Sequence, residues 1–67
     1  MNIEQIGEVI RERRDVLEID QRALSEIAGV AVHTLSNIEA GSGNPTVKSL
    51  NKVLGALGME IRVEVQQ

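Results

Sequence analysis

The segment from residue 24 to residue 38 constrains the fold of this chain most, because it predicts two short helices joined by a tight turn. Its apolar residues recur three or four positions apart on both sides of a glycine: Leu24, Ile27 and Ala28 before it, Leu35 and Ile38 after it. This is the spacing of one apolar helix face. Gly29 lies where the end of a helix favours a residue that accepts left-handed backbone angles. Val30 adds an apolar side chain in the turn itself.

Two short helices with a glycine in the turn and a buried hydrophobic residue beside it form the helix-turn-helix pattern. The second helix of such a unit can enter the major groove of DNA, which is wide enough to admit an α-helix. We expect this second helix over residues 32–40. Its outward side is therefore the first candidate for a functional surface.

Capping residues predict where the first two helices begin. Asn2 and Gln5 have the spacing of a capping box, so we expect a helix over residues 3–17. The inner face of that helix is the stripe of Ile3, Ile6, Ile10 and Leu17. Asp20 is a favourable N-cap for the next helix, which we expect over residues 21–28.

A fourth helix is expected after the loop over residues 41–45, which is rich in glycine and contains the only proline. Thr46 caps this helix, and Gly58 ends it. Its predicted inner face consists of Val47, Leu50, Val53, Leu54 and Leu57.

One charged residue interrupts the apolar stripe of the first helix. Arg14 follows Ile10 by four positions, where an apolar residue is expected. A buried arginine without a carboxylate partner costs several kcal/mol. Glu39 directly follows the buried Ile38, so we predict an ion pair between Arg14 and Glu39.

The alternation of the last residues predicts a β-strand. Apolar and charged side chains face opposite ways: Met59, Ile61, Val63 and Val65 on one side, Glu60, Arg62 and Glu64 on the other. Nothing else in the chain reads as a strand, and a single strand leaves its backbone groups unpaired. We expect the same strand of a second copy to pair with it, antiparallel across a two-fold axis.

Cross-strand charge restricts the register of this pairing. An axis on Arg62 places Glu60 opposite Glu64, and like charges in this position repel. An axis on Ile61 or Val63 places Arg62 opposite a glutamate on both sides. We predict one of these two registers, and with either of them a homodimer.

Composition excludes several classes of function. The 67 residues make one small domain without cysteine, so they offer no disulfide, thiolate metal site or thiol nucleophile. With one histidine and no phosphate-cradling glycine motif, we expect no catalytic residues, no metal, no cofactor and no enzyme activity. No apolar run approaches the ~20 residues that span a membrane, and no signal peptide is recognisable, so we expect a cytoplasmic protein without membrane contact.

Three runs of residues at fixed offsets resemble one protein family. They read Gln21-x-x-Leu24-Ser25-x-x-Ala28-Gly29-Val30, then Thr34-Leu35-Ser36-x-Ile38-Glu39-x-Gly41, then Asn44-Pro45-Thr46. Together they resemble the Cro and phage-repressor type (XRE) DNA-binding domain, over about residues 6–57. The resemblance implies an all-α, lambda-repressor-like helix-turn-helix domain of four to five helices over residues 1–58. With the dimerisation strand and tail over residues 59–67, the chain looks more like the HipB-type antitoxins and their single-domain relatives.

The resemblance assigns roles to polar residues of this sequence. Positions that contact phosphates or hold the backbone are matched by Gln21, Thr34, Ser36, Asn44 and Thr46. Positions that reach base edges are matched by Val32, His33 and Asn37. Arg22 completes the expected DNA-binding set. Arg14 and Glu39 match a buried ion pair that links the first helix to the recognition helix, which agrees with the pairing inferred above.

Two functions follow as expectations. The first is a sequence-specific repressor, dimeric on double-stranded DNA with a palindromic operator, and a possible antitoxin. The alternative is a protein-binding module that restrains a partner such as a toxin kinase, with weak or no DNA binding. The net charge of −3, and the lack of Lys or Arg between Arg22 and Lys48, argue against strong non-specific DNA affinity. Ala31 also stands where the family usually has Ser or Thr as a helix cap.

Overall fold

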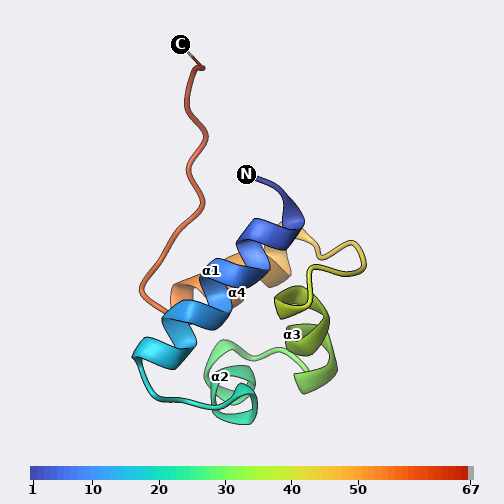
Figure 1. Ribbon diagram of the computed structural model, residues 1–67, viewed down its shortest axis with the longest axis vertical. Coiled ribbons are helices and arrows are strands. Elements are labelled where there is room, and N and C mark those ends of the chain that lie inside the picture. Colours follow the sequence, from blue (N-terminus) through green and yellow to red (C-terminus); the bar gives the residue numbers. More distant parts are fainter. Residues whose placement is uncertain (67) are drawn as a thin grey trace.

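The computed structural model describes residues 1–66 and contains four α-helices (Figure 1). They are α1 (Ile3–Val16), α2 (Gln21–Ala28), α3 (Val32–Glu39) and α4 (Val47–Ala56). The predicted all-α domain is confirmed, and α1 and α3 end one residue earlier than expected. Within the described residues, no helix has both the length and the apolar character needed to cross a membrane.

Side-chain caps explain where three of the helices begin. Asn2 and Gln5 form the predicted capping box: Asn2 Oδ1 accepts from the backbone N–H of Gln5 at 2.9 Å, and Gln5 Oε1 accepts from that of Asn2 at 2.8 Å. Asp20 and Thr46 each accept from the backbone N–H three residues later, at 2.8 and 3.0 Å. Ala31 supplies no such bond, so α3 begins without a side-chain cap.

The core lies where the four helices meet. Its buried apolar side chains are Ile10, Leu24, Leu35, Ile38, Leu50, Val53, Leu54 and Leu57. α1 packs against α3, and α2 packs against both α3 and α4. α3 is therefore held by two neighbours while another of its sides remains free to face solvent. In Figure 1, α2 and α3 lie at the end of the molecule away from the tail.

The prediction that Ile27 belongs to the inner face of α2 is wrong, because its side chain is 64% exposed. The side of α2 that packs on the core is formed by Leu24, Ser25 and Ala28. Ser25 can be buried there because its hydroxyl donates to the carbonyl oxygen of Arg22 at 2.7 Å. Ser25, a polar residue with a local acceptor, is thus buried on α2, and Ile27, which the apolar spacing placed on the inner face, is not.

Two more residues of the predicted inner faces are exposed at helix ends. Val47, the first residue of α4, is 65% exposed, and Leu17, which follows α1, is 41% exposed. At both positions the apolar stripe continues past the side chains that the neighbouring helices cover. Helical spacing identifies a face, but it does not show where the helix leaves the core.

Gly7 marks the closest approach of α1 to α3. A Cβ atom at this position would overlap the carbonyl oxygen of Ile38 and lie 2.9 Å from that of Glu39. Both oxygens belong to the backbone at the end of α3, so neither can turn aside as a side chain would. Glycine is therefore required here for the packing of two helices.

Residues 59–66 leave the helical domain as an extended tail without a strand (Figure 1). The backbone N–H of Met59 donates to the carbonyl oxygen of Leu54 at 2.8 Å, and residues 60–66 make no backbone–backbone hydrogen bond with the described chain. A strand requires a neighbour for its backbone groups, and a single chain does not supply one here. The strand and its pairing across a dimer stay predictions, and Gln67 lies outside the described residues.

Candidate nucleic-acid interface

α3 turns one side to the core and the other to solvent. Leu35 and Ile38 are buried and hold the helix to the domain. The predicted DNA-binding residues of α3 lie on the remaining sides: Val32, His33 and Ser36, which are exposed, and Thr34 and Asn37, which are half-buried. α3 therefore presents polar and small apolar side chains that a molecule bound along the helix can contact.

One hydrogen bond joins two of these outward residues. Nδ2 of Asn37 lies 3.3 Å from Nε2 of His33, one helical turn earlier. An amide nitrogen only donates hydrogen bonds, so the tautomer of His33 that accepts this bond at Nε2 is the one with its proton on Nδ1. The side chain of Asn37 is thus held by its neighbour on the same helix.

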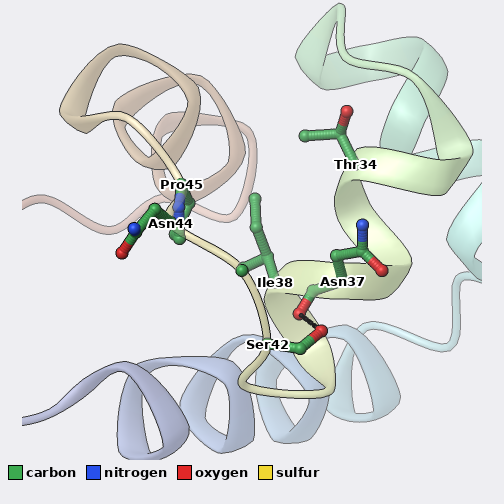
Figure 2. Close-up of a pocket in the computed structure, with 7 residues that line it drawn as sticks. Thr34, Asn37, Ile38, Ser42, Asn44 and Pro45 are labelled. Atoms are coloured by element: carbon green, nitrogen blue, oxygen red, sulfur yellow. Dashed lines mark hydrogen bonds between the residues drawn. The ribbon is translucent and has the colours of Figure 1, made fainter.

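The loop after α3 is attached to the same helix. The backbone N–H and the hydroxyl of Ser42 both donate to the carbonyl oxygen of Asn37, at 3.0 and 3.3 Å. A hollow of about 150 Å³ lies between α3 and the loop, lined by Thr34, Asn37, Ile38, Ser42, Gly43, Asn44 and Pro45 (Figure 2). Asn44 and Thr46, the predicted phosphate contacts of the loop, are exposed. The structure therefore brings Asn44 to the hollow beside α3, whereas Thr46 caps α4.

The first residues of α2 lie near the end of α3. Arg22 is exposed, and Gln21 is half-buried. Nε2 of Gln21 donates to Oε1 of Glu39 at 3.2 Å, which connects the first residue of α2 to the last residue of α3. Among residues 1–66 no other hydrogen bond uses the side chain of Gln21, so its second N–H remains able to meet a phosphate.

A buried ion pair ties α1 to the end of α3. Nε and Nη2 of Arg14 donate to Oε2 and Oε1 of Glu39, at 2.9 and 3.0 Å, and Nη1 donates to the carbonyl oxygen of Ile19 at 3.0 Å. Only 4% of the Glu39 side chain and 15% of the Arg14 side chain is exposed. Hydrogen bonding to Glu39 raises the pKa of the Arg14 guanidinium above its ordinary value, so this group is charged at any neutral or acidic pH. The pairing expected from the sequence is present and fixes α3 relative to α1.

The electrostatics of this surface are unusual for phosphate binding. α3 and the following loop contain no Lys or Arg, and the basic residues that flank them in the sequence are Arg22 and Lys48, both exposed. Neutral hydrogen-bond donors can contact phosphates, but they release few counterions. In the part of the chain that the structure describes, no three His, Cys, Asp or Glu residues gather as metal ligands would.

A comparison with models of protein families matches residues 10–63 to the helix-turn-helix family of the Cro/C1 (XRE) type. The match extends from the middle of α1 into the tail and covers most of the chain. The chain belongs to the Cro/C1-type helix-turn-helix family. This family consists of DNA-binding regulators. A comparison with curated proteins finds no matching relative.

In this helix-turn-helix protein, α2 and α3 are the two helices of the unit, and Gly29 forms the turn with a φ of 74°. Three features of the interface were not anticipated from the sequence: the bond from Gln21 to Glu39, the attachment of Ser42 to Asn37, and the hollow beside them. Each depends on where the loop and α2 lie relative to α3. The bond between His33 and Asn37 had a signal in the sequence, because residues four apart are neighbours on a helix.

Proposed function

We propose that this protein is a sequence-specific transcriptional repressor that binds a palindromic operator as a homodimer. The observation that supports this most is the outward side of α3, where Val32, His33 and Asn37 are accessible while Leu35 and Ile38 fasten the helix to the core. A helix held in this manner suits the major groove of DNA, and the family is one of DNA-binding regulators.

The proposed contacts divide into base-reading and backbone-binding groups. Asn37 is suited to reading adenine, and Val32 is suited to packing on the methyl group of thymine. Phosphates and the DNA backbone are contacted by Gln21, Arg22, Thr34, Ser36, Asn44 and Thr46. Only one residue of this second set is charged, so we expect the affinity for DNA to fall less steeply with salt than in strongly basic family members.

Homodimerisation is supported by the exposure of the tail. Val63 and Val65 are 95% and 88% exposed, and apolar side chains in such a row favour a covering partner. A largely apolar groove of about 470 Å³ lies at the base of the tail, lined by Met1, Ile6, Val9, Leu54, Met59, Glu60, Ile61 and Arg62. Pairing with the tail of a second copy would supply hydrogen bonds to the backbone groups of the tail. It would also cover Val63, Val65 and the apolar groove. A two-fold dimer of this kind can hold two copies of α3 about one DNA turn apart, ~34 Å.

The test begins with selection of bound sequences from random duplex DNA, followed by mobility shifts on the selected site. We expect Asn37→Ala to weaken binding to this site by about tenfold or more, because one good base contact contributes about 1–3 kcal/mol. Asn51→Ala is the matched control, since Asn51 is an exposed asparagine of α4 outside the interface. If Asn37→Ala and Asn51→Ala shift DNA alike, the outward side of α3 is not the reading surface.

A second candidate is a protein-binding module that restrains a partner such as a toxin kinase, alone or in addition to DNA binding, as in an antitoxin. It is favoured by exposed acidic residues at helical spacing along α1: Glu4, Glu8, Glu12 and Asp15. An exposed acidic row of this kind suits a basic protein surface. A stable complex with a kinase from a neighbouring gene, without a DNA shift, favours this candidate. A salt-dependent shift with DNA upstream of its own gene favours the repressor.

A further inference from the structure

The hydrogen bond between His33 and Asn37 indicates which base the recognition helix accepts. We propose that His33 is a positioning residue that fixes the amide of Asn37 in one orientation and thereby restricts it to adenine. This proposal rests on the proposed binding of α3 in the major groove. It changes the role of His33 from a base-contacting residue to one that acts through its neighbour.

The bond between the two side chains has a defined direction. Nδ2 of Asn37 donates to Nε2 of His33, since an amide nitrogen cannot accept. One of the two N–H groups of Asn37 is used in this way. The amide then has one N–H and one carbonyl oxygen left for DNA.

Nothing else in the described chain sets the rotation of this amide. The main chain of Asn37 is fixed at its carbonyl oxygen by the two bonds from Ser42. Figure 2 shows the amide of Asn37 beyond this attachment, with its nitrogen directed along α3 toward the turn that carries Thr34. On its loop side, Asn37 borders the hollow of about 150 Å³ rather than a packed side chain. Among residues 1–66, His33 alone forms a hydrogen bond with the Asn37 side chain.

The remaining groups of Asn37 match adenine and not guanine. In the major groove adenine presents an acceptor at N7 and a donor at N6, whereas guanine presents acceptors at both N7 and O6. One N–H and one carbonyl oxygen complement adenine. Guanine needs two donors, and the second N–H of Asn37 is engaged with His33. Without His33 the amide can rotate and offer both N–H groups to guanine, which lowers its preference for adenine.

The experiment uses the full chain and duplexes selected by the wild-type protein from random DNA. Each A·T pair of a half-site is replaced in turn by G·C, and dissociation constants are measured for the wild type, Asn37→Ala, His33→Ala and His33→Gln. One adenine-to-guanine replacement should weaken the wild type by about 10-fold to 100-fold and Asn37→Ala hardly at all, which identifies the base that Asn37 reads. At that base His33→Ala should discriminate clearly less than the wild type, by about tenfold less if the amide is free to rotate. His33→Gln should retain most of the discrimination, because its Oε1 can accept the same bond.

The outcomes separate this proposal from the proposed function. If the wild type selects no DNA sequence, the proposed function fails. If the wild type binds its site and His33→Ala keeps the full preference for adenine, the positioning role is overturned and the function stands. If His33→Ala weakens binding to the adenine and guanine duplexes equally, the positioning role is also overturned, because His33 then contacts DNA directly. Since His33 is exposed, circular dichroism should show all variants folded as the wild type is.

Discussion

The helical domain and the tail of this protein differ in whether the same chain supplies partners for their backbone groups and apolar side chains. In the domain, side-chain caps begin three helices and eight apolar side chains are buried together. In the tail, residues 60–66 make no backbone–backbone hydrogen bond with the described chain, and Val63 and Val65 are almost fully exposed. The domain is therefore specified by contacts within one chain, whereas the backbone of residues 60–66 finds no partner in the described chain. We expect changes in one region to leave the other unaffected.

The largest effect is expected for Glu39→Ala, which would show how far the domain depends on its internal ion pair. The variant removes the buried carboxylate that binds Arg14, leaving the exposed Asp15, whose Oδ1 lies 3.7 Å from Nη1, as its nearest acidic partner, and it leaves Gln21 without its acceptor. Removing one partner of a buried pair costs about 3–5 kcal/mol. We expect about 3 kcal/mol of the free energy of unfolding to be lost, since 15% of the Arg14 side chain still reaches solvent. Urea unfolding followed by circular dichroism measures this loss.

A double variant provides the control for Glu39→Ala. Arg14→Met combined with Glu39→Leu removes both charges and replaces them with apolar groups of similar size. It should recover most of the lost free energy of unfolding, because no buried charge remains unpaired. An unfolding free energy that is equal in the wild type and Glu39→Ala would contradict a structural role for the pair.

The next effect is expected for Gly7→Ala, which tests the contact between α1 and α3. The added Cβ overlaps the carbonyl oxygen of Ile38, so the two helices must move apart. Overpacking of this kind costs about 1–3 kcal/mol of the free energy of unfolding. Gly55→Ala is the matched control, because a Cβ there meets nothing within 4 Å. The control should instead stabilise α4 by up to ~1 kcal/mol, and similar effects of the two variants would refute the close approach at Gly7.

The tail is tested by Arg62→Glu, which should weaken the dimer and leave the domain intact. In either predicted register the substitution opposes glutamates on both sides of the two-fold axis. Cross-strand pairs contribute about 0.2–1 kcal/mol each, so two lost and reversed pairs should weaken dimerisation by about tenfold. Sedimentation equilibrium measures the dissociation constant of the dimer. At concentrations where the protein is monomeric, the free energy of unfolding should equal that of the wild type.

A charge-exchanged tail is the control for this variant. Glu60→Arg and Glu64→Arg, added to Arg62→Glu, restore opposite charges across the axis in both registers. Dimerisation should return to near the wild-type level. If Arg62→Glu dimerises as well as the wild type, the two strands do not pair in either register.

Features of the domain that depend on residues close together in the sequence could be predicted from it. The capping box at Asn2 and Gln5 and the turn at Gly29 each require residues within a few positions. The pairing of Arg14 with Glu39 could also be inferred, since one charge interrupted an apolar stripe and another followed a buried residue.

Other features depend on surfaces that the sequence does not display. Ile27 has the spacing of a core residue but is exposed, because the neighbours of α2 cover the side that carries Ser25. From the sequence, a glycine inside a helix, such as Gly7, is only a weak helix former. Glycine is needed at this position because the backbone of α3 leaves no room for a Cβ atom. The attachment of Ser42 and the hollow next to Asn37 likewise arise only when the loop has returned to α3.

The smallest effect is expected for Ala31→Ser, which tests whether the stability of the domain is independent of the tail. Ala31 is exposed, has a φ of −67° and a ψ of 147°, and supplies no cap to α3. A serine hydroxyl at this position can accept from a free N–H of the first turn, which contributes about 0.5–1 kcal/mol. Ala40→Ser is the control, since the same change at the other end of α3 cannot cap an N–H group. The gain in the free energy of unfolding should be equal with and without Arg62→Glu in the tail. A gain that disappears in the Arg62→Glu background would mean that the two regions are coupled, because the stability of α3 would then depend on the second chain.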